Sequence, residues 1–331
     1  MTALLRAEAL VKNFPAEHRV FGRPRRFVHA VSGVSFEVEK GKTLGLVGES
    51  GCGKSTIGRM LLGIVPPTSG RVMLGEVDVT ALAGEPLRAQ RRRMQMIFQD
   101  PYASLNPRMR IADAVGEPLE IHRPEMTAAD RRARVADLLA RVGLRPEHAQ
   151  RFPAEFSGVQ RQRIVIARAL AVEPELLVAD EPVSALDVSI QAQIVNLLMD
   201  LQAERTLTYV FISHDLKVVE HVSDEVLVMY LGRVMERAPA GALFSSTRHP
   251  YTQALLSAVP DPRPGRRLGR ILLEGDVPSP LAPPSGCVFH PRCPLRTRLD
   301  LAKQARCRDE VPALRVLGDG HASACHFAEE V

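Results

Sequence analysis

The sequence predicts an α/β fold in which a mainly parallel sheet is flanked by helices, carries a helical insertion and is followed by a small irregular C-terminal region. Short apolar runs alternate with helical patterns up to about residue 245, which is typical of a parallel sheet. Over about 100–170 the apolar residues repeat with helical period, which indicates the insertion. Beyond residue 245 seven prolines fall within 260–286, and four of the five cysteines follow them.

Each element follows from its own local pattern. The alternating segment 31–38 predicts a half-buried strand, and the apolar run 44–47 predicts a fully buried one. Further strands are expected at 71–74, 94–98, 176–179, 209–212 and 226–230, and helices at 55–62, 112–120, 129–142, 160–171, 188–204 and 216–221. We expect one large domain over 1–245, which contains the helical subdomain at about 100–170, and a Cys-rich C-terminal region over 246–331.

Composition limits the classes of protein to which the chain can belong. Apolar residues make up 45% and charged residues 24% of the 331 residues, as in soluble globular proteins. No stretch approaches the roughly 18 apolar residues of a membrane-spanning helix, and the N-terminus lacks the features of a signal peptide. We therefore expect a cytosolic chain whose cysteines are ligands or free thiols rather than disulfides. The net charge of +5 permits contact with nucleic acid but does not require it.

The strongest motif is a glycine-rich loop between a predicted strand and a predicted helix. Residues 48–55 spell GESGCGKS and precede Thr56, which matches the pattern G-x-x-x-x-G-K-[ST]. Such glycines let the backbone wrap a polyphosphate so that N–H groups and the helix N-terminus face its oxygens. Lys54 can reach the β- and γ-phosphates, and Ser55 can ligate Mg²⁺. The motif predicts a nucleotide site rather than a chance glycine-rich turn.

Two carboxylates, Asp180 and Glu181, follow the apolar run 176–179. A strand that ends in this pair places both side chains at the carboxyl edge of the sheet, where ligands bind in such folds. Asp180 is expected to hold Mg²⁺ through water, and Glu181 to polarise the water that attacks the γ-phosphate. Taken alone, the pair would predict an ordinary acidic strand end with a helix N-cap at Ser184. Beside the glycine-rich loop, the catalytic interpretation is favoured.

With FSGVQ at 156–160, these motifs resemble the nucleotide-binding subunits of ABC transporters, over about residues 4–245. Other marks of that family occur in the same order. Gln99 resembles the Q-loop glutamine, SALD at 184–187 the D-loop, and His214 the switch histidine. The resemblance implies a P-loop (RecA-like) parallel sheet core with antiparallel N-terminal strands and a helical signature subdomain.

The resemblance also implies the roles of the motif residues. In this family two chains face each other head to tail, and the signature segment of each completes the ATP site of the other. The implied catalytic residues are Glu181, His214 and Gln99, and the implied Mg²⁺ ligands are Ser55, Gln99 and Asp180. The implied ATP-binding residues are Phe14, which would stack on adenine, and Gly48, Ser50, Gly51, Gly53, Lys54, Ser55, Thr56, Ser157, Gly158, Gln160 and Asp187.

The signature departs from the family pattern at Val159, where the family has a second glycine. Ser157 is a suitable N-cap for the helix that follows it. Valine adds a branched side chain where the backbone must approach a phosphate, and it resists φ > 0. We expect the site that this segment completes to be weakened or noncatalytic, and a harmless valine that points away is the alternative.

Two further segments resemble the ATPase subunits of oligopeptide, dipeptide and nickel importers: FQDPYASLNP at 98–107 and HPYTQALLSAVP at 249–260. The first of them, with the long N-terminal stretch, is similar to the second of the two ATPase subunits of that group. The resemblance implies a peripheral ATPase on the cytoplasmic face of the inner membrane. Its implied partners are a second related ATPase, two transmembrane permease subunits and an extracytoplasmic solute-binding protein, with no nucleic acid.

Four cysteines in the C-terminal region predict a metal or cluster site: Cys287, Cys293, Cys307 and Cys325. Their spacing, C-x5-C-x13-C-x17-C, lacks the close C-x2-C pairs of structural zinc sites and leaves zinc and iron–sulfur open. The resemblance implies a [4Fe–4S] cluster on these thiols, and zinc and free thiols are the alternatives.

Two other classes of function compete with transport. An ABC ATPase that acts on nucleic acid or ribosomes usually joins two ATPase halves or carries long coiled coils. This chain has one set of motifs and no heptad run. A redox-sensing module built on the cysteines is the third class.

Overall fold

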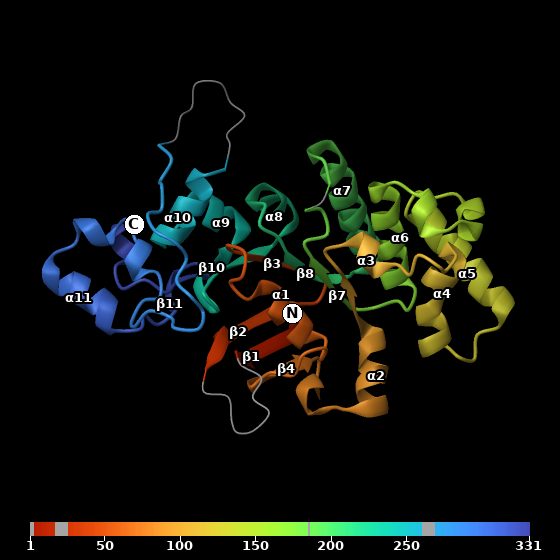
Figure 1. The fold of residues 1–331 in the computed structure, drawn as a ribbon, viewed down its shortest axis with the longest axis horizontal. Helices are drawn as coiled ribbons and strands as arrows, with labels where there is room; N and C mark the ends of the chain where they lie inside the picture. The colour runs from red at the N-terminus through yellow and green to blue at the C-terminus, as the bar shows by residue number, and fades with distance from the viewer. Residues whose placement is uncertain (1–2, 17–25, 185, 260–268) are drawn as a thin grey trace.

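The computed structural model describes residues 3–16, 26–184, 186–259 and 269–331 (Figure 1). Within these residues the strands form a sheet of eight strands and a sheet of four. Helix α1 (Lys54–Leu61) packs between them, because it contacts strands of both sheets and shares one apolar core with them. This core holds the two sheets together around α1.

The parallel strands lie in the middle of the larger sheet. β3 (Thr43–Val47) pairs in parallel with β8 (Thr208–Ile212) and β9 (Glu225–Tyr230). The order continues from β8 through β7 (Leu176–Asp180) to β6 (Met94–Ile97). Every residue of β3, β7 and β8 is buried, so these strands appear in the sequence as largely apolar runs. Their predicted positions are confirmed.

The smaller sheet is antiparallel, in the order β2-β1-β4-β5. It consists of β1 (Ala3–Pro15), β2 (Phe27–Glu39), β4 (Ser69–Leu74) and β5 (Val77–Asp78). The register between β1 and β2 shifts at several points, and such irregularities break the alternation of buried and exposed residues. For this reason periodicity alone did not predict β1.

Residues 101–170 fold into helices, as their period predicted, and they lie at the right of Figure 1. These are the short α3 (Pro101–Ser104), α4 (Ile111–His122), α5 (Ala128–Arg141) and α6 (Gly158–Leu170). Besides α1, the other α-helices described up to residue 259 are α2 (Gly84–Arg93), α7 (Val188–Arg205), α8 (Leu216–Val222), α9 (Ala240–Ser245) and α10 (Pro250–Ser257). Short 3₁₀ turns occur at 79–81, 146–150, 153–155, 290–292, 296–298 and 328–330. Among the helices described, none is both long and apolar enough to cross a bilayer.

The C-terminal region is more regular than its composition predicted. It contains α11 (Leu301–Asp309) and a hairpin of β11 (Arg315–Gly318) and β12 (His321–Ser323). β12 pairs with β10 (Arg233–Pro239), so the hairpin extends the large sheet. The expectation of irregular structure does not hold for these elements, because the edge of a sheet offers backbone partners that no local pattern shows. The prolines at 260, 262 and 264 lie outside the described residues.

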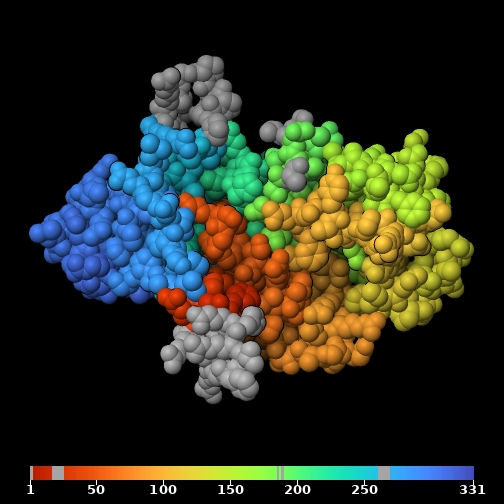
Figure 2. All heavy atoms as spheres, viewed as in Figure 1, coloured from red at the N-terminus to blue at the C-terminus, as the bar shows by residue number. Residues whose placement is uncertain are grey.

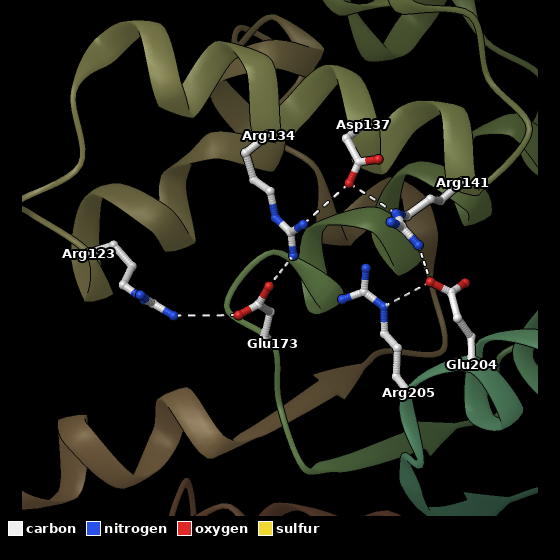
Figure 3. Close-up of polar contacts among 7 residues, drawn as sticks. All are labelled: Arg123, Arg134, Asp137, Arg141, Glu173, Glu204 and Arg205. Atoms are coloured by element: carbon white, nitrogen blue, oxygen red, sulfur yellow. Dashed lines mark hydrogen bonds and ion pairs between the residues drawn. The ribbon is translucent and has the colours of Figure 1, made fainter.

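An ion-pair network joins the helical insertion to the sheet domain (Figure 3). Arg134 on α5 donates to Glu173 in the turn before β7, with 2.7 Å between Nη2 and Oε1. Arg123, at the end of α4, lies 3.5 Å from the other oxygen of Glu173. Arg141 on α5 contacts Glu204 near the end of α7. Because several of these side chains are substantially exposed, the network orients α5 more than it stabilises the fold.

Replacing Arg134 by Gln should therefore lower the melting temperature by at most about 4 °C. The difference from wild type should shrink in ~1 M NaCl, where charges are screened over about 3 Å. Scanning calorimetry at low and high salt measures both values. Arg306→Gln is the control, because Arg306 forms an exposed ion pair with Glu310 at the C-terminal end of α11. A large loss that salt does not change would contradict an orienting role.

Candidate nucleotide-binding site

The glycine-rich loop 48–53 joins the carboxyl end of β3 to α1. Gly48 has φ 148° and Gly53 has φ 106°, a region that disfavours residues with side chains. A Cβ atom on Gly48 would lie 2.2 Å from the carbonyl oxygen of Met229, and one on Gly53 would lie 2.3 Å from that of Ala30. Only glycine allows the loop to lie this close to β9 and β2.

Lys54 is the first residue of α1, and its side chain folds back over the loop. The residue is 4% exposed, and Nζ donates to the carbonyl oxygens of Gly48, at 2.7 Å, and Glu49, at 3.0 Å. Across the described part of the chain, no carboxylate forms an ion pair with this ammonium. A buried charge that meets two carbonyl dipoles and the Cys52 sulfur, at 3.7 Å, favours a bound anion, and the N-terminus of α1 adds to that preference.

Ser55 and Asp180 meet at the same edge of the sheet. The Ser55 hydroxyl donates to Asp180 Oδ1 over 2.9 Å. Burial raises the pKa of the Asp180 carboxyl, the hydrogen bond from Ser55 opposes this, and the charge of Glu181 raises the pKa further. A cation at this position would favour the charged carboxylate. Mg²⁺ in nucleotide sites takes one or two protein oxygens and completes its shell with phosphate and water, so this pair of donors fits it.

Two of the side chains predicted to be catalytic, Gln99 and His214, converge on an oxygen atom of the third, Glu181. Gln99 follows β6, Glu181 follows β7 and His214 follows β8, and these are adjacent strands. Gln99 Nε2 donates to Glu181 Oε2 over 3.0 Å, and His214 Nδ1 lies 3.3 Å from the same oxygen. Glu181 adopts the left-handed φ of 48°, and its N–H donates to the Ile212 carbonyl oxygen at 2.9 Å. A non-glycine residue held in this conformation is typical of functional sites.

A cavity of about 490 Å³ lies between the loop and these side chains. Most of the predicted loop residues and the three predicted catalytic residues line it. Its lining consists of Val28, Ala30, Ser50, Gly51, Gly53, Lys54, Ser55, Thr56, Gln99, Glu181, His214 and Pro280. The arrangement provides a buried cation, loop N–H groups and a carboxylate poised beside a space that can hold a polyphosphate.

Three lining residues were not predicted: Val28 and Ala30 on β2, and Pro280 from the C-terminal region. Phe14, predicted to stack on adenine, is not among the lining residues, although its antiparallel partner on β2 is Val28. No local motif marks these positions. Their approach to the loop depends on pairing between strands and on the path of the C-terminal chain.

The signature residues do not line this cavity. Ser157 is the N-cap of α6, and its hydroxyl and the Gln160 side chain form a reciprocal capping box. A Cβ on Gly158 would lie 3.9 Å from Leu186 of the segment 184–187. Asp187 is exposed at the N-terminus of α7, and Ala185 lies outside the described residues. Within one chain, these residues form a separate surface.

Val159 lies in the first turn of α6 with a negative φ. Its side chain packs against the large apolar core. The expectation that valine must resist φ > 0 at this position is therefore wrong, because the helix begins one residue earlier, at Gly158. The packed side chain agrees with the alternative of a harmless valine.

All four C-terminal cysteines are free thiols. Burial is the largest cause that raises their pKa values, to about 12 for Cys287 and Cys325. Cys287 and Cys293 pack with the large core, and Cys307 packs with Leu299 and Phe327. Within the described ranges, no group of three or more His, Cys, Asp or Glu side chains is arranged to hold a metal ion. The described residues therefore do not support the predicted cluster.

Comparison with known proteins decides the family. Residues 31–184 match the ABC transporter family, and residues 235–298 match the C-terminal region of oligopeptide/dipeptide transporters. The di/tripeptide transport ATP-binding protein DppF of Pseudomonas aeruginosa is 51% identical over 100% of this chain and 99% of its own length. This chain belongs to the ATP-binding proteins of peptide ABC transporters. The oligopeptide transport ATP-binding protein AppF of Bacillus subtilis is also similar, 50% identical over 98% of this chain and 97% of its own.

Solved ABC cassettes share the fold. The ATP-binding cassette MJ0796, solved as a dimer in a post-hydrolysis state with ADP and Pi, matches with a TM-score of 0.63 and 27% identity. That match covers 71% of this chain and 98% of the cassette. CbiO1 from Clostridium perfringens, part of the cbiONQ transporter complex, matches with a TM-score of 0.64 and 27% identity over 73% and 91% of the two chains. The predicted ABC ATPase fold is confirmed.

Because Val159 is unstrained, replacing it by Gly should not raise the ATPase rate of the assembled complex by more than about twofold. Glycine near the start of α6 should instead lower the melting temperature slightly, since it costs the helix up to about 1 kcal/mol. Steady-state ATPase and thermal melts measure both effects, with Val159→Ala as the matched control. A rate increase of tenfold or more in Val159→Gly, absent from Val159→Ala, would restore the weakened-site hypothesis.

Proposed function

We propose that this chain is the ATP-hydrolysing subunit of an ABC importer for peptides or a similar small nutrient. The observation that carries the proposal is the convergence of Gln99, Glu181 and His214 beside the loop that holds Lys54. Near-half identity over the full chain to peptide transport ATP-binding proteins supports the transport role. Nothing in these comparisons favours the rival action on nucleic acid or ribosomes.

The cradle for the triphosphate follows from the site geometry. The N–H groups of the loop residues Gly48, Ser50, Gly51 and Gly53 and of Thr56 would face the phosphate oxygens, and Lys54 would donate to the β- and γ-phosphates. Ser55, Asp180 and Gln99 would hold Mg²⁺, which neutralises charge on those phosphates. The apolar wall of Val28, Ala30 and Pro280, with Phe14 paired to Val28 on the neighbouring strand, is proposed to receive the base.

Glu181 is the proposed general base. Its Oε2 accepts a hydrogen bond from Gln99 and lies 3.3 Å from His214 Nδ1, and these two neighbours would orient the carboxylate toward an attacking water. The proton of that water would move to Glu181 as its oxygen attacks the γ-phosphorus, while the bond from the γ-phosphorus to the β–γ bridging oxygen breaks. ADP would leave with that oxygen, and inorganic phosphate would be the other product. His214 is proposed to contact the γ-phosphate or the attacking water. The chemistry is chiefly positioning and electrostatic stabilisation.

The proposed working unit is a head-to-tail ATPase dimer. Ser157, Gly158, Gln160 and Asp187 lie away from the cavity of their own chain and would complete the ATP site of the partner. The partner is proposed to be a second related ATPase, bound with two permease subunits at the cytoplasmic face of the inner membrane and served by an extracytoplasmic solute-binding protein. In this proposal residues 1–245 form the nucleotide-binding domain, with the helical subdomain at 100–170, and residues 246–331 follow it.

The [4Fe–4S] cluster and the redox-sensing class are not part of this proposal. Cys287 and Cys307 are buried and Cys293 and Cys325 are partly buried, and no step of the proposed cycle depends on these thiols.

Replacing Glu181 by Gln keeps the shape of the side chain but removes the basic oxygen. In the assembled importer, hydrolysis should fall by at least ~100-fold while Mg·ATP binding stays within about threefold of wild type. Phosphate release and nucleotide titration measure the two quantities. The control is Glu220→Gln, an exposed glutamate of α8. Near-normal turnover in Glu181→Gln would contradict the assigned role.

A further inference from the structure

The C-terminal region touches the phosphate loop at Glu49. The N–H of Glu49 donates to the Tyr251 hydroxyl, on α10, over 2.9 Å. Its carboxylate accepts from Arg292, with Nη1 3.0 Å from Oε2 and 3.3 Å from Oε1. Figure 2 shows the same relation at the surface, where the blue C-terminal residues lie directly beside the red and orange residues of the first strands and the loop.

Arg292 is held in place from several sides. Its side chain is 10% exposed and that of Glu49 is 25% exposed, so the pair is shielded from solvent more than the surface ion pairs are. Arg292 Nη1 also lies 3.4 Å from the Tyr230 hydroxyl. The backbone N–H of Arg292 donates to the Phe289 carbonyl oxygen at 3.0 Å. Tyr230, Tyr251 and Phe289 are fully buried and pack ring against ring beneath it.

A second segment of the same region reaches the site independently. Residues 277–280 lie over the loop and enclose a small cavity of about 240 Å³ with residues 49–52. The His29 N–H on β2 donates to the Pro280 carbonyl oxygen over 3.0 Å, and Pro280 also lines the nucleotide cavity. The C-terminal chain therefore contacts both the loop and the strand that walls the cavity.

Glu49 also contacts the buried Lys54. The carbonyl oxygen of Glu49 accepts from Lys54 Nζ at 3.0 Å, while its carboxylate is bound by Arg292. One residue thus links the C-terminal region to the ammonium that would meet the phosphates. A shift of Glu49 would move a hydrogen-bond partner of Lys54, and small displacements in such sites have large effects on binding and rate.

We propose that Arg292 is a positioning residue for the phosphate loop: by binding the Glu49 carboxylate it fixes the loop around Lys54, and so makes the C-terminal region part of the ATP site. This inference rests on the proposed function. It assigns to residues 277–292 a role in nucleotide binding that no motif in the sequence marks. The role requires no metal and no partner chain.

Titration of Mg·ATP into the full-length chain tests the proposal. Arg292→Gln should weaken binding about tenfold, because a partly buried carboxylate loses its charged donor. Glu49→Gln should weaken binding similarly, and the double variant should lose no more than either single one, since both remove the same contact. The matched control is Arg315→Gln, which removes the exposed pair with Glu329 in the same region and should bind ATP as wild type does.

Exchange of the charges separates positioning from folding. Arg292→Glu combined with Glu49→Arg should recover at least half of the lost binding free energy, whereas each single reversal should bind more weakly than its Gln variant. Wild-type affinity in Arg292→Gln, or additive losses in the Gln double variant, would overturn the proposal. If the wild-type chain itself failed to bind Mg·ATP, the proposed function would fail instead, so the two failures are distinguishable.

Discussion

The site depends on one buried ammonium. Lys54 is almost completely enclosed, and it is held by two backbone carbonyls of its own loop rather than by a carboxylate. Burying a cation without a neighbouring anion is unfavourable, so the buried ammonium favours the binding of a negatively charged group at this point. The glycines at 48 and 53 let the backbone close around it, and α1 begins at Lys54 so that its N-terminus adds potential of the same sign. A polyphosphate satisfies all three features together.

The topology of the sheet supplies the chemistry. Because β3, β8, β7 and β6 are adjacent and parallel, the residues that follow them emerge at one edge. Asp180 then lies against Ser55, and Glu181 lies between Gln99 and His214, although these residues are far apart in the sequence. The unusual φ of Glu181 turns its side chain toward its neighbours immediately after the strand. The packed core on both faces of the sheet maintains this geometry.

The parts of the structure that local patterns determine were predictable. Buried parallel strands appear as apolar runs, and the loop motif needs its glycines, Lys54 and Ser55 within eight consecutive residues. Contacts made by distant chain segments were not predictable. The irregular pairing of β1, the hairpin that extends the sheet, and the approach of Pro280 and Arg292 to the loop depend on tertiary packing. At Val159 the local pattern was misleading. Valine in place of the family's second glycine suggested backbone strain, but α6 begins at Gly158, so Val159 has the negative φ of an ordinary helical residue.

The most direct test of the account is a calorimetric titration of Mg·ATP into the full-length chain and into its Lys54→Ala variant. If the buried ammonium is the centre of the site, the wild-type chain binds one Mg·ATP per molecule, and the variant binds at least ~100-fold more weakly while keeping its fold by circular dichroism. Equal affinity in the two proteins, or no binding heat from the wild-type chain, would contradict it.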